Sequence, residues 1–194
     1  MERELMVTGI GGQGVQLATQ VLARAAMAEG REVLLFGSYG GMMRGGNTDT
    51  TLVLADGPIE APPVVPSTWA AIVMHHDYWH PVRQRLRPGS LVLVNTSVFE
   101  ARDELDAVWQ VIELPATDLA VDVGNIMTAS LVMVGAFASA TAIVGLDALR
   151  HGLEEAMPPY RRQHIPLNLA ALDAGFGAVP AGTHPAWTSE EVTA

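Results

Sequence analysis

The sequence predicts an α/β fold with a mostly parallel central sheet, and three patterns along the chain predict it. First, the short apolar run Leu5-Met6-Val7 leads into glycines at 9, 11 and 14 and then into a helical pattern, which is the order of a strand, a tight turn and a helix. Second, short apolar runs alternate with polar segments as far as Leu114. Third, the remainder carries helical patterns. Together these patterns predict a Rossmann-like three-layer fold with a helical C-terminal part.

The first expected elements surround the glycine turn. A strand at Leu5–Thr8 precedes the turn, and a helix from about Val15 to Glu29 follows it and ends at Gly30, which acts as a C-cap glycine. A strand at Glu32–Phe36 then completes a β-α-β unit, whose crossover should be right-handed.

The later elements continue the alternation. An irregular stretch at 37–47 leads to a strand at Thr48–Leu54, and a proline-rich connector at 61–66 leads to the second half of the sheet. The elements expected there are a strand at Ala70–Met74, a helix at His76–Leu86, a turn at Pro88-Gly89, and strands at Leu91–Val94 and Trp109–Leu114.

The C-terminal part contains a run of 24 residues, 123–146, without a single charge. The run is rich in Ala, Gly, Ser and Thr and poor in large aliphatic residues, so we expect it to be buried in protein rather than in a membrane. Helices at Leu149–Met157 and Leu167–Ala174 should follow. We expect residues 1–177 to form one domain, and residues 178–194 to be a tail that is flexible or wrapped on a partner.

Composition excludes several classes of function. The formal net charge is −10, and no basic cluster exceeds Arg161-Arg162, so we expect no nucleic-acid and no membrane partner. The chain has no cysteine, so it offers no thiolate for an iron–sulfur cluster or a covalent reaction. It has no lysine either, which excludes a Schiff base and a Walker-type phosphate lysine. The charged start of the chain runs straight into a strand without the pattern of a signal peptide, and a cytoplasmic protein is expected.

The glycine turn has the spacing of a dinucleotide-binding loop, but half of that fingerprint is missing. A dinucleotide site needs an acidic residue about 20 positions further on, near the end of the second strand. This chain has Leu34-Leu35-Phe36-Gly37-Ser38 there, and Glu32 lies at the wrong end of the strand. A tight turn without a nucleotide is therefore favoured, and a free-standing nucleotide-binding oxidoreductase is the alternative.

A second glycine-rich segment, 38–47, decides the interpretation. Together with Gly9–Val15 it resembles the γ subunit, or γ domain, of the 2-oxoacid:ferredoxin oxidoreductases, the thiamine-dependent enzymes that act on pyruvate, 2-oxoglutarate, branched-chain oxoacids, indolepyruvate or phenylglyoxylate. The similarity continues from about residue 5 to 176 through the segments 56–59, 114–117, 124–125, 135–136 and 168–175. The family often has an asparagine five residues after the Gly124-Asn125 pair, where this chain has Ser130.

The resemblance implies a division of labour among subunits. Thiamine diphosphate and magnesium are expected on the α and β subunits, and [4Fe-4S] clusters on β and on a small ferredoxin-like δ subunit. The assembled enzyme would decarboxylate a 2-oxoacid oxidatively to an acyl-CoA, with coenzyme A as co-substrate and ferredoxin or a flavin/NAD subunit as acceptor. The γ subunit would bind none of these cofactors alone. It would serve assembly and could help form the coenzyme A or substrate side of the site.

We expect no catalytic residue in this chain and place its ligand or interface loop at two glycine segments and one asparagine. Arg44 could bind a phosphate or carboxylate through its guanidinium, or pair with a carboxylate such as Asp49 or one on a partner subunit. Tyr39 is expected to be an interface anchor. The full set of candidates is Gly9, Gly11, Gly12, Gln13, Gly14, Ser38, Tyr39, Gly40, Arg44, Gly45, Gly46, Asn47 and Asn125.

Two further patterns lead elsewhere. His76 and His80 stand four residues apart with Asp77 between them, which is compatible with a metal site on a helix. Pro81 in the first helical turn disturbs that geometry and no third ligand is obvious, so we expect no metal site. The uncharged run also suggests a third hypothesis, a self-assembling structural protein.

Overall fold

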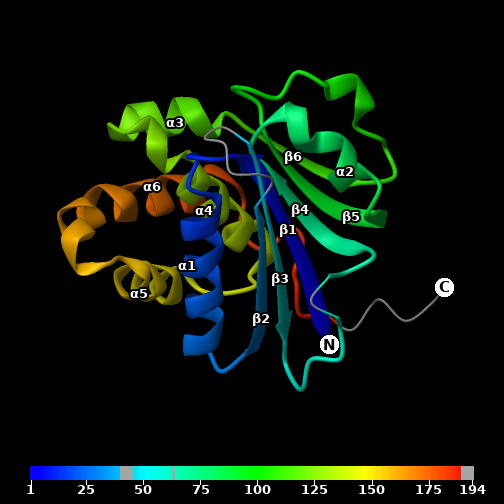
Figure 1. Ribbon diagram of the computed structural model, residues 1–194, viewed down its shortest axis with the longest axis horizontal. Coiled ribbons are helices and arrows are strands. Elements are labelled where there is room, and N and C mark those ends of the chain that lie inside the picture. The colour runs from blue at the N-terminus through cyan, green and yellow to red at the C-terminus, as the bar shows by residue number, and fades with distance from the viewer. Residues whose placement is uncertain (40–45, 63, 189–194) are drawn as a thin grey trace.

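One mixed sheet organises the molecule, in the strand order β2-β3-β1-β4-β5-β6 (Figure 1). The computed structural model describes residues 1–39, 46–62 and 64–188. β3 runs antiparallel to both of its neighbours, and every other pair in the sheet is parallel. The expected mostly parallel sheet is therefore confirmed. The strands are β1 (Glu2–Ile10), β2 (Glu32–Tyr39), β3 (Asn47–Ala55), β4 (Thr68–Val73), β5 (Leu86–Asn95) and β6 (Gln110–Leu114).

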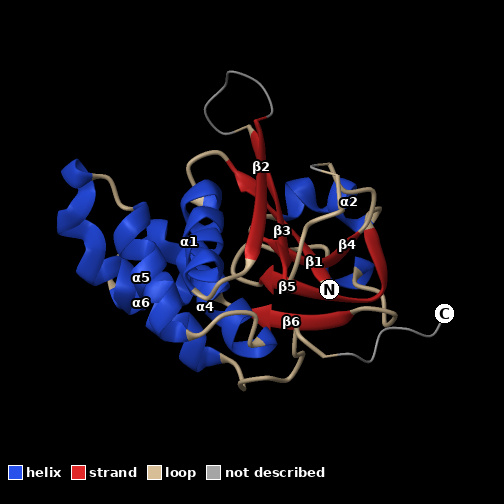
Figure 2. Ribbon diagram, turned by 90° about the horizontal axis from the view of Figure 1, so that it is seen from below, coloured by secondary structure: helices blue, strands red, loops and turns tan. Residues whose placement is uncertain are grey.

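The helices cover the two faces of the sheet unequally. The short helix α2 lies on one side, and the larger helices lie together on the other (Figures 1 and 2). The larger helices are α1 (Val15–Ala28), α3 (Ala116–Val123), α4 (Ala129–Thr141), α5 (Leu146–Ala156) and α6 (Ile165–Ala178), and α2 spans Trp79–Arg83. The 3₁₀ segments are η1 (His76–Tyr78), η2 (Arg102–Glu104), η3 (Ile126–Thr128) and η4 (Pro159–His164). The helical C-terminal part is confirmed.

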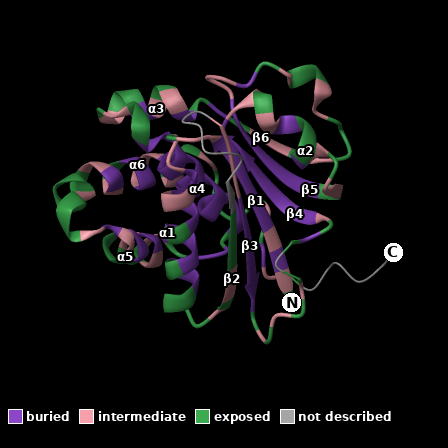
Figure 3. Ribbon diagram, viewed as in Figure 1, coloured by how far each residue is buried: buried purple, intermediate pink, exposed green. Residues whose placement is uncertain are grey.

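Helix α4 is the centre of the helical side. All 13 of its residues are buried, so no side of the helix faces solvent (Figure 3). It packs on α6, and their backbones meet at Gly135 and Gly175, where a Cβ on either glycine would overlap backbone atoms of the other helix. The part of the uncharged run at 128–141 is thus buried in protein, as expected, whereas Gly124, Ile126 and Met127 at its start are exposed. Within the described residues, none of the helices is long and apolar enough to cross a membrane.

The two antiparallel strand pairs of the sheet lie at its β2 edge. β1 and β2 run in the same direction, but β3 lies between them and pairs with both strands. The connection from β2 to β3 is local, so the second strand of the β-α-β unit forms a hairpin with the strand that follows it.

The helix expected at 76–86 was wrong in its extent. The chain forms η1, the five-residue α2, and then enters β5 at Leu86. The backbone N–H of Thr68 donates to the carbonyl oxygen of Arg85 at 2.8 Å, which ties the chain to the neighbouring strand early. The expected Pro88-Gly89 turn lies within β5, where Gly89 has φ +82° and the register with β4 shifts. Helix α3 was not expected.

The C-terminal segment runs back over the end of α4. The backbone N–H groups of Gly182, His184 and Ala186 donate to the carbonyl oxygens of Ser139, Ala140 and Thr141 at 2.7–2.8 Å. The Trp187 indole donates to the carbonyl oxygen of Ile143 at 3.0 Å, and the buried Arg3 guanidinium donates to the carbonyl oxygen of Ala186. The segment as far as Thr188 therefore packs on this chain. Its contact with a partner stays a prediction.

Candidate functional site

The glycine turn between β1 and α1 is closed by its own hydrogen bonds. The side-chain oxygen of Gln13 accepts the N–H of Ile10 at 2.7 Å, and the N–H of Gln13 donates to the carbonyl oxygen of Ile10 at 3.0 Å. Gly12 and Gly14 have φ +108° and +80°, a region that favours glycine. A Cβ on Gly9 would lie 2.7 Å from the Gln13 oxygen and 2.9 Å from the Cβ of Met74. Backbone conformation thus accounts for the glycines at 12 and 14, and close packing for the glycine at 9.

The second glycine-rich segment is anchored on the first. The N–H of Gly11 donates to the carbonyl oxygen of Gly46 at 2.8 Å. The Asp49 carboxylate accepts from the Thr8 hydroxyl and from the Asn47 side-chain amide, both at 2.6 Å. The C-terminal end of the second glycine-rich segment is therefore held against the glycine turn, at the carboxyl end of β1. Of the other candidates in this segment, Ser38 and Tyr39 are backbone members of β2, and Gly40, Arg44 and Gly45 lie outside the described residues.

A third segment joins these two from the helical side. A Cβ on Gly14 would lie 2.8 Å from the Ser130 hydroxyl and 3.7 Å from the carbonyl oxygen of Met127. The side-chain oxygen of Asn125 accepts the N–H of Met127 at 3.0 Å and so begins the η3 turn. We call the segments 8–14, 46–49 and 125–130 together the loop junction.

Exposed apolar side chains lie in the loop junction and on the adjoining helix α3. Val121, Ile126 and Met127 are each more than half exposed, with relative accessibilities of 54, 55 and 57%. Large apolar side chains gathered at a loop edge are typical of a protein contact surface. The loop junction thus combines a network of polar contacts with an edge of exposed apolar side chains, Val121, Ile126 and Met127, which we call the apolar rim.

The structure brings together most of the residues that the sequence singled out, and it adds others. Thr8, Met74 and Ser130 were not expected in the site. Ser130 had a signal in the sequence, because it stands where the family often has asparagine. The candidates that the junction unites are Gly9, Gly11, Gly12, Gln13, Gly14, Gly46, Asn47 and Asn125.

The geometry disfavours a dinucleotide at this turn. In a dinucleotide-binding fold the second strand neighbours the first and brings its acidic residue to the ribose. Here β3 intervenes, so the end of β2 lies two strand spacings, about 10 Å, from β1. The N–H groups of Ile10, Gly11 and Gln13 also donate within the protein. The N–H groups that would bind a phosphate are thus already paired with the Gln13 side chain and with the carbonyl oxygens of Ile10 and Gly46.

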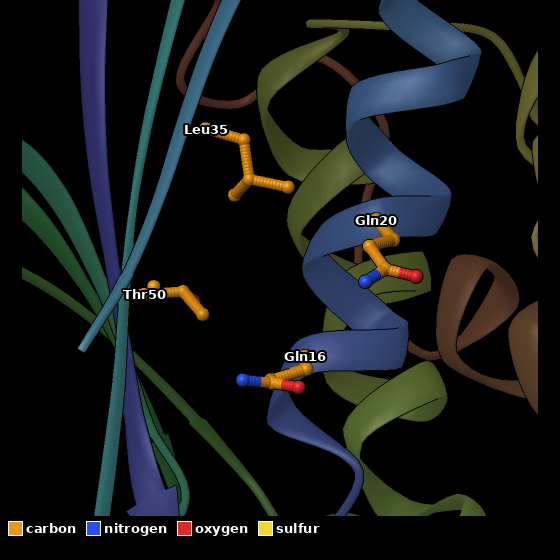
Figure 4. Close-up of a pocket in the computed structure, with 5 residues that line it drawn as sticks. Gln16, Gln20, Leu35 and Thr50 are labelled. Atoms are coloured by element: carbon orange, nitrogen blue, oxygen red, sulfur yellow. The ribbon is translucent and has the colours of Figure 1, made fainter. Parts of the chain in front are cut away.

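A small cavity with both polar and apolar lining lies between α1 and the β2–β3 hairpin. It has a volume of about 220 Å³ and is lined by Gln16, Gln20, Leu35, Gly37 and Thr50. Leu35 and Thr50 point from the strands toward α1, where Gln16 and Gln20 lie on the facing side of the helix (Figure 4). Sites for drug-sized ligands usually enclose roughly 300–1,000 Å³. This cavity alone is therefore too small for a nucleotide-sized ligand.

Comparison with known proteins identifies the family. A family model described as pyruvate ferredoxin/flavodoxin oxidoreductase matches residues 4–178. The chain belongs to this family.

Relatives of similar length support the same assignment over nearly the whole of this chain. The 2-oxoglutarate synthase subunit KorC of Methanothermobacter marburgensis is 30% identical, with 90% of this chain and 95% of the relative covered. The indolepyruvate oxidoreductase subunit IorB of Archaeoglobus fulgidus is 26% identical, with 94% and 98% covered. The solved gamma subunit of a keto/oxoacid ferredoxin oxidoreductase from Geobacter sulfurreducens is 25% identical and has a TM-score of 0.77, with 91% and 95% covered. The expected resemblance to γ subunits is confirmed.

The contact between Gly14 and Ser130 leads to a stability prediction for this family member. Gly14→Ala should lower the free energy of unfolding by about 2–3 kcal/mol, because alanine pays about 1–2 kcal/mol for the left-handed backbone and also crowds the Ser130 hydroxyl. Adding Ser130→Ala should recover only the free energy lost by crowding, because the hydroxyl is then gone, and the cost of the left-handed backbone should remain. Urea denaturation of the single and double variants measures this coupling. Strictly additive effects of the two substitutions would contradict the packing described here.

Proposed function

We propose that this chain is the γ subunit of a cytoplasmic 2-oxoacid:ferredoxin oxidoreductase and that it serves assembly of the complex through the loop junction. The observation that carries the proposal is the family match over residues 4–178, joined to a rigid loop edge with an apolar rim. Val121, Ile126 and Met127 are suited to contact a partner subunit.

The chemistry of the complex is assigned to other subunits. The chain has no cysteine, so iron–sulfur clusters must be held by thiolates elsewhere. By resemblance to the family, we propose that thiamine diphosphate and magnesium bind to the α and β subunits. The assembled enzyme would convert a 2-oxoacid and coenzyme A into an acyl-CoA and carbon dioxide, and pass two electrons to ferredoxin or to a flavin/NAD subunit. The isolated chain should have no turnover.

The second glycine segment is proposed to face the coenzyme A or substrate side of that enzyme. Its C-terminal end is held by the Gly11–Gly46 hydrogen bond and by the bond from Asn47 to Asp49, and its N-terminal end pairs with β3 as the last residues of β2. The cavity between α1 and the β2–β3 hairpin is too small to enclose coenzyme A, so a partner subunit would complete the binding surface. Arg44 is the cation of this segment that would meet a phosphate or a partner carboxylate.

An Arg44→Ala variant separates these two roles. If Arg44 binds coenzyme A, the assembled enzyme should keep its composition and lose apparent affinity for coenzyme A by about ten-fold or more, with KM for the 2-oxoacid unchanged. If Arg44 binds a partner, the complex itself should dissociate more readily. Arg24→Ala is a matched control, because Arg24 pairs with Glu155 at 3.7 Å on the exposed side of α1. An Arg44→Ala enzyme identical to wild type in both assays would remove Arg44 from the proposal.

A further inference from the structure

A second cavity, with a volume of about 170 Å³, lies against the sheet on the side away from α1. Its floor is one row of side chains, because Thr51 of β3 stands opposite Met6 of β1 and Phe36 of β2 in antiparallel pairs. Met6 packs in the buried apolar cluster with Trp79 and Val82 of α2, and α2 and α1 lie on opposite sides of the sheet (Figure 2). The cavity is lined by Met6, Phe36, Asp49, Thr51, Val64 and Arg85.

Arg85 brings a cation to this cavity, and the described residues offer it no carboxylate partner. Its guanidinium Nη1 lies 3.9 Å from the sulfur of Met6, which is a weak acceptor. Glu4, on the same face of β1 as Met6, is already paired with Arg87 at 2.7 Å. The backbone of Arg85 is held by Thr68, whose N–H donates to its carbonyl oxygen at 2.8 Å. The side chain therefore extends from a fixed point and presents N–H donors to the cavity.

Thr51 and Asp49 add a hydroxyl and a carboxylate. Thr51 is only 8% exposed, and its hydroxyl has no hydrogen-bond partner in the part of the chain that the structure describes. A buried hydroxyl without a partner is costly, so a ligand atom that accepts from it is favoured. The Asp49 carboxylate accepts from Thr8 and Asn47 at 2.6 Å and has further lone pairs. Among the described residues it forms no ion pair with Arg85, so the cavity holds a cation and an anion that do not neutralise each other directly.

Phe36 and Val64 give the cavity an apolar part. They are 42% and 57% exposed, so both have apolar surface that a ligand can remove from water. The volume lies below the roughly 300–1,000 Å³ of sites for drug-sized ligands, which restricts the occupant to a small molecule. The cavity therefore suits a small molecule that carries both charges and an apolar group.

We propose that this cavity binds a free α-amino acid with an apolar side chain. The carboxylate of the amino acid accepts from the Arg85 guanidinium and from the Thr51 hydroxyl. Its ammonium group donates to the Asp49 carboxylate, and its side chain covers Phe36 and Val64. A simple anion would be repelled by Asp49 and a simple cation by Arg85, so the cavity selects a zwitterion. The site goes beyond the proposed function, because it needs no partner subunit.

An NMR titration of the ¹⁵N-labelled full-length chain tests the proposal without any enzyme activity. L-Leucine should bind with a Kd of about 1 mM or below, and the backbone amide signals that shift should be those around Met6, Thr51 and Phe36. Two analogues of leucine separate its charges. 4-Methyl-2-oxopentanoate lacks the ammonium group and 3-methylbutylamine lacks the carboxylate, and each should bind about ten-fold more weakly than leucine, or worse.

Two variants test the residues that hold the carboxylate. Arg85→Met removes the cation but keeps an unbranched side chain, and it should weaken leucine binding by about ten-fold or more. Thr51→Val replaces the hydroxyl with a methyl group and should weaken binding by about three-fold or more. Arg83→Ala is the matched control, because Arg83 pairs with Glu104 at 3.2 Å and lies outside the lining of the cavity. Binding to this control should stay within about two-fold of the wild-type value. The NMR spectra also establish that each variant is folded.

Three results would overturn the proposal. The first is a spectrum that leucine leaves unchanged up to about 20 mM, or changes only in another part of the chain. The second is equally tight binding of 4-methyl-2-oxopentanoate, because Asp49 would then play no part. The third is undiminished binding to the Arg85→Met variant. A chain that binds leucine as described but joins no complex would support this inference and contradict the proposed function, so the two failures are distinguishable.

Discussion

The Gly175→Ala variant is expected to be less stable than the wild-type chain by about 3 kcal/mol or more. A Cβ on Gly175 would overlap the carbonyl oxygen of Val132 and lie 2.6 Å from its carbon. These are backbone atoms of a helix buried on all sides, so they cannot rotate away as a side chain can. The two helices would have to separate at their crossing, and the apolar contacts on both sides of it would loosen.

Gly177→Ala is the matched control for this prediction. Gly177 lies on the same helix, and a Cβ there has no atom within 4 Å. The control should be neutral or more stable by up to about 1 kcal/mol, because alanine favours the helix. Thermal and urea denaturation of both variants measure the difference, and the Gly175 variant should melt roughly 6–12 °C lower. A loss below about 0.5 kcal/mol would show that the helices do not cross at these glycines.

Removal of residues 179–194 is expected to destabilise the domain by roughly 3–5 kcal/mol. The deletion takes away the three backbone donors that satisfy the last carbonyl groups of α4, and the indole that binds the carbonyl of Ile143. It also removes one acceptor of the buried Arg3 guanidinium and the Trp187 ring that Arg31 covers at 4.1 Å. Polar groups that were paired and buried would then meet water or remain unpaired.

A shorter deletion controls for the loss of chain length. Removing residues 189–194 alone breaks none of these hydrogen bonds, so the free energy of unfolding should stay within about 0.5 kcal/mol of the wild-type value. Urea denaturation of the two truncated chains gives the comparison. Equal stability of the longer deletion and the wild type would contradict the packing of this segment on α4.

The sequence predicts the buried helix α4 from its composition, but not the helix that it meets. A run without charges has no face for solvent, so burial follows directly. The crossing at Gly135 and Gly175 depends on two residues 40 positions apart in the sequence, and no local pattern connects them. Helix α3 escaped prediction because its eight residues offer too short a pattern.

The strand order shows the same limit. Apolar alternation finds β2 and β3 individually, yet the pairing of β3 with both β1 and β2 is a property of the folded sheet. The helix expected at 76–86 ended early for a similar reason. Pairing of β5 with β4 began at Leu86, and tertiary hydrogen bonds overrode the helical pattern.

The site was predictable where it depends on backbone conformation. The glycines at 12 and 14 stand where φ is positive, and their spacing is visible in the chain. The contacts of Thr8 with Asp49 and of Gly14 with Ser130 join distant segments, and only the structure reveals them. His76 and His80 were expected on one helix, but the chain forms the single turn η1 and then the short helix α2 there, and the His80 side chain lies 3.1 Å from that of Gln84.

Affinity purification of the tagged chain from its native host, under anaerobic and gentle conditions, tests the central proposal most directly. We expect cysteine-rich and thiamine-binding subunits to purify with it, together with iron–sulfur colour and 2-oxoacid-dependent reduction of a dye. A colourless chain recovered alone, or one that carries a tightly bound nucleotide, would contradict the assignment as an assembly subunit.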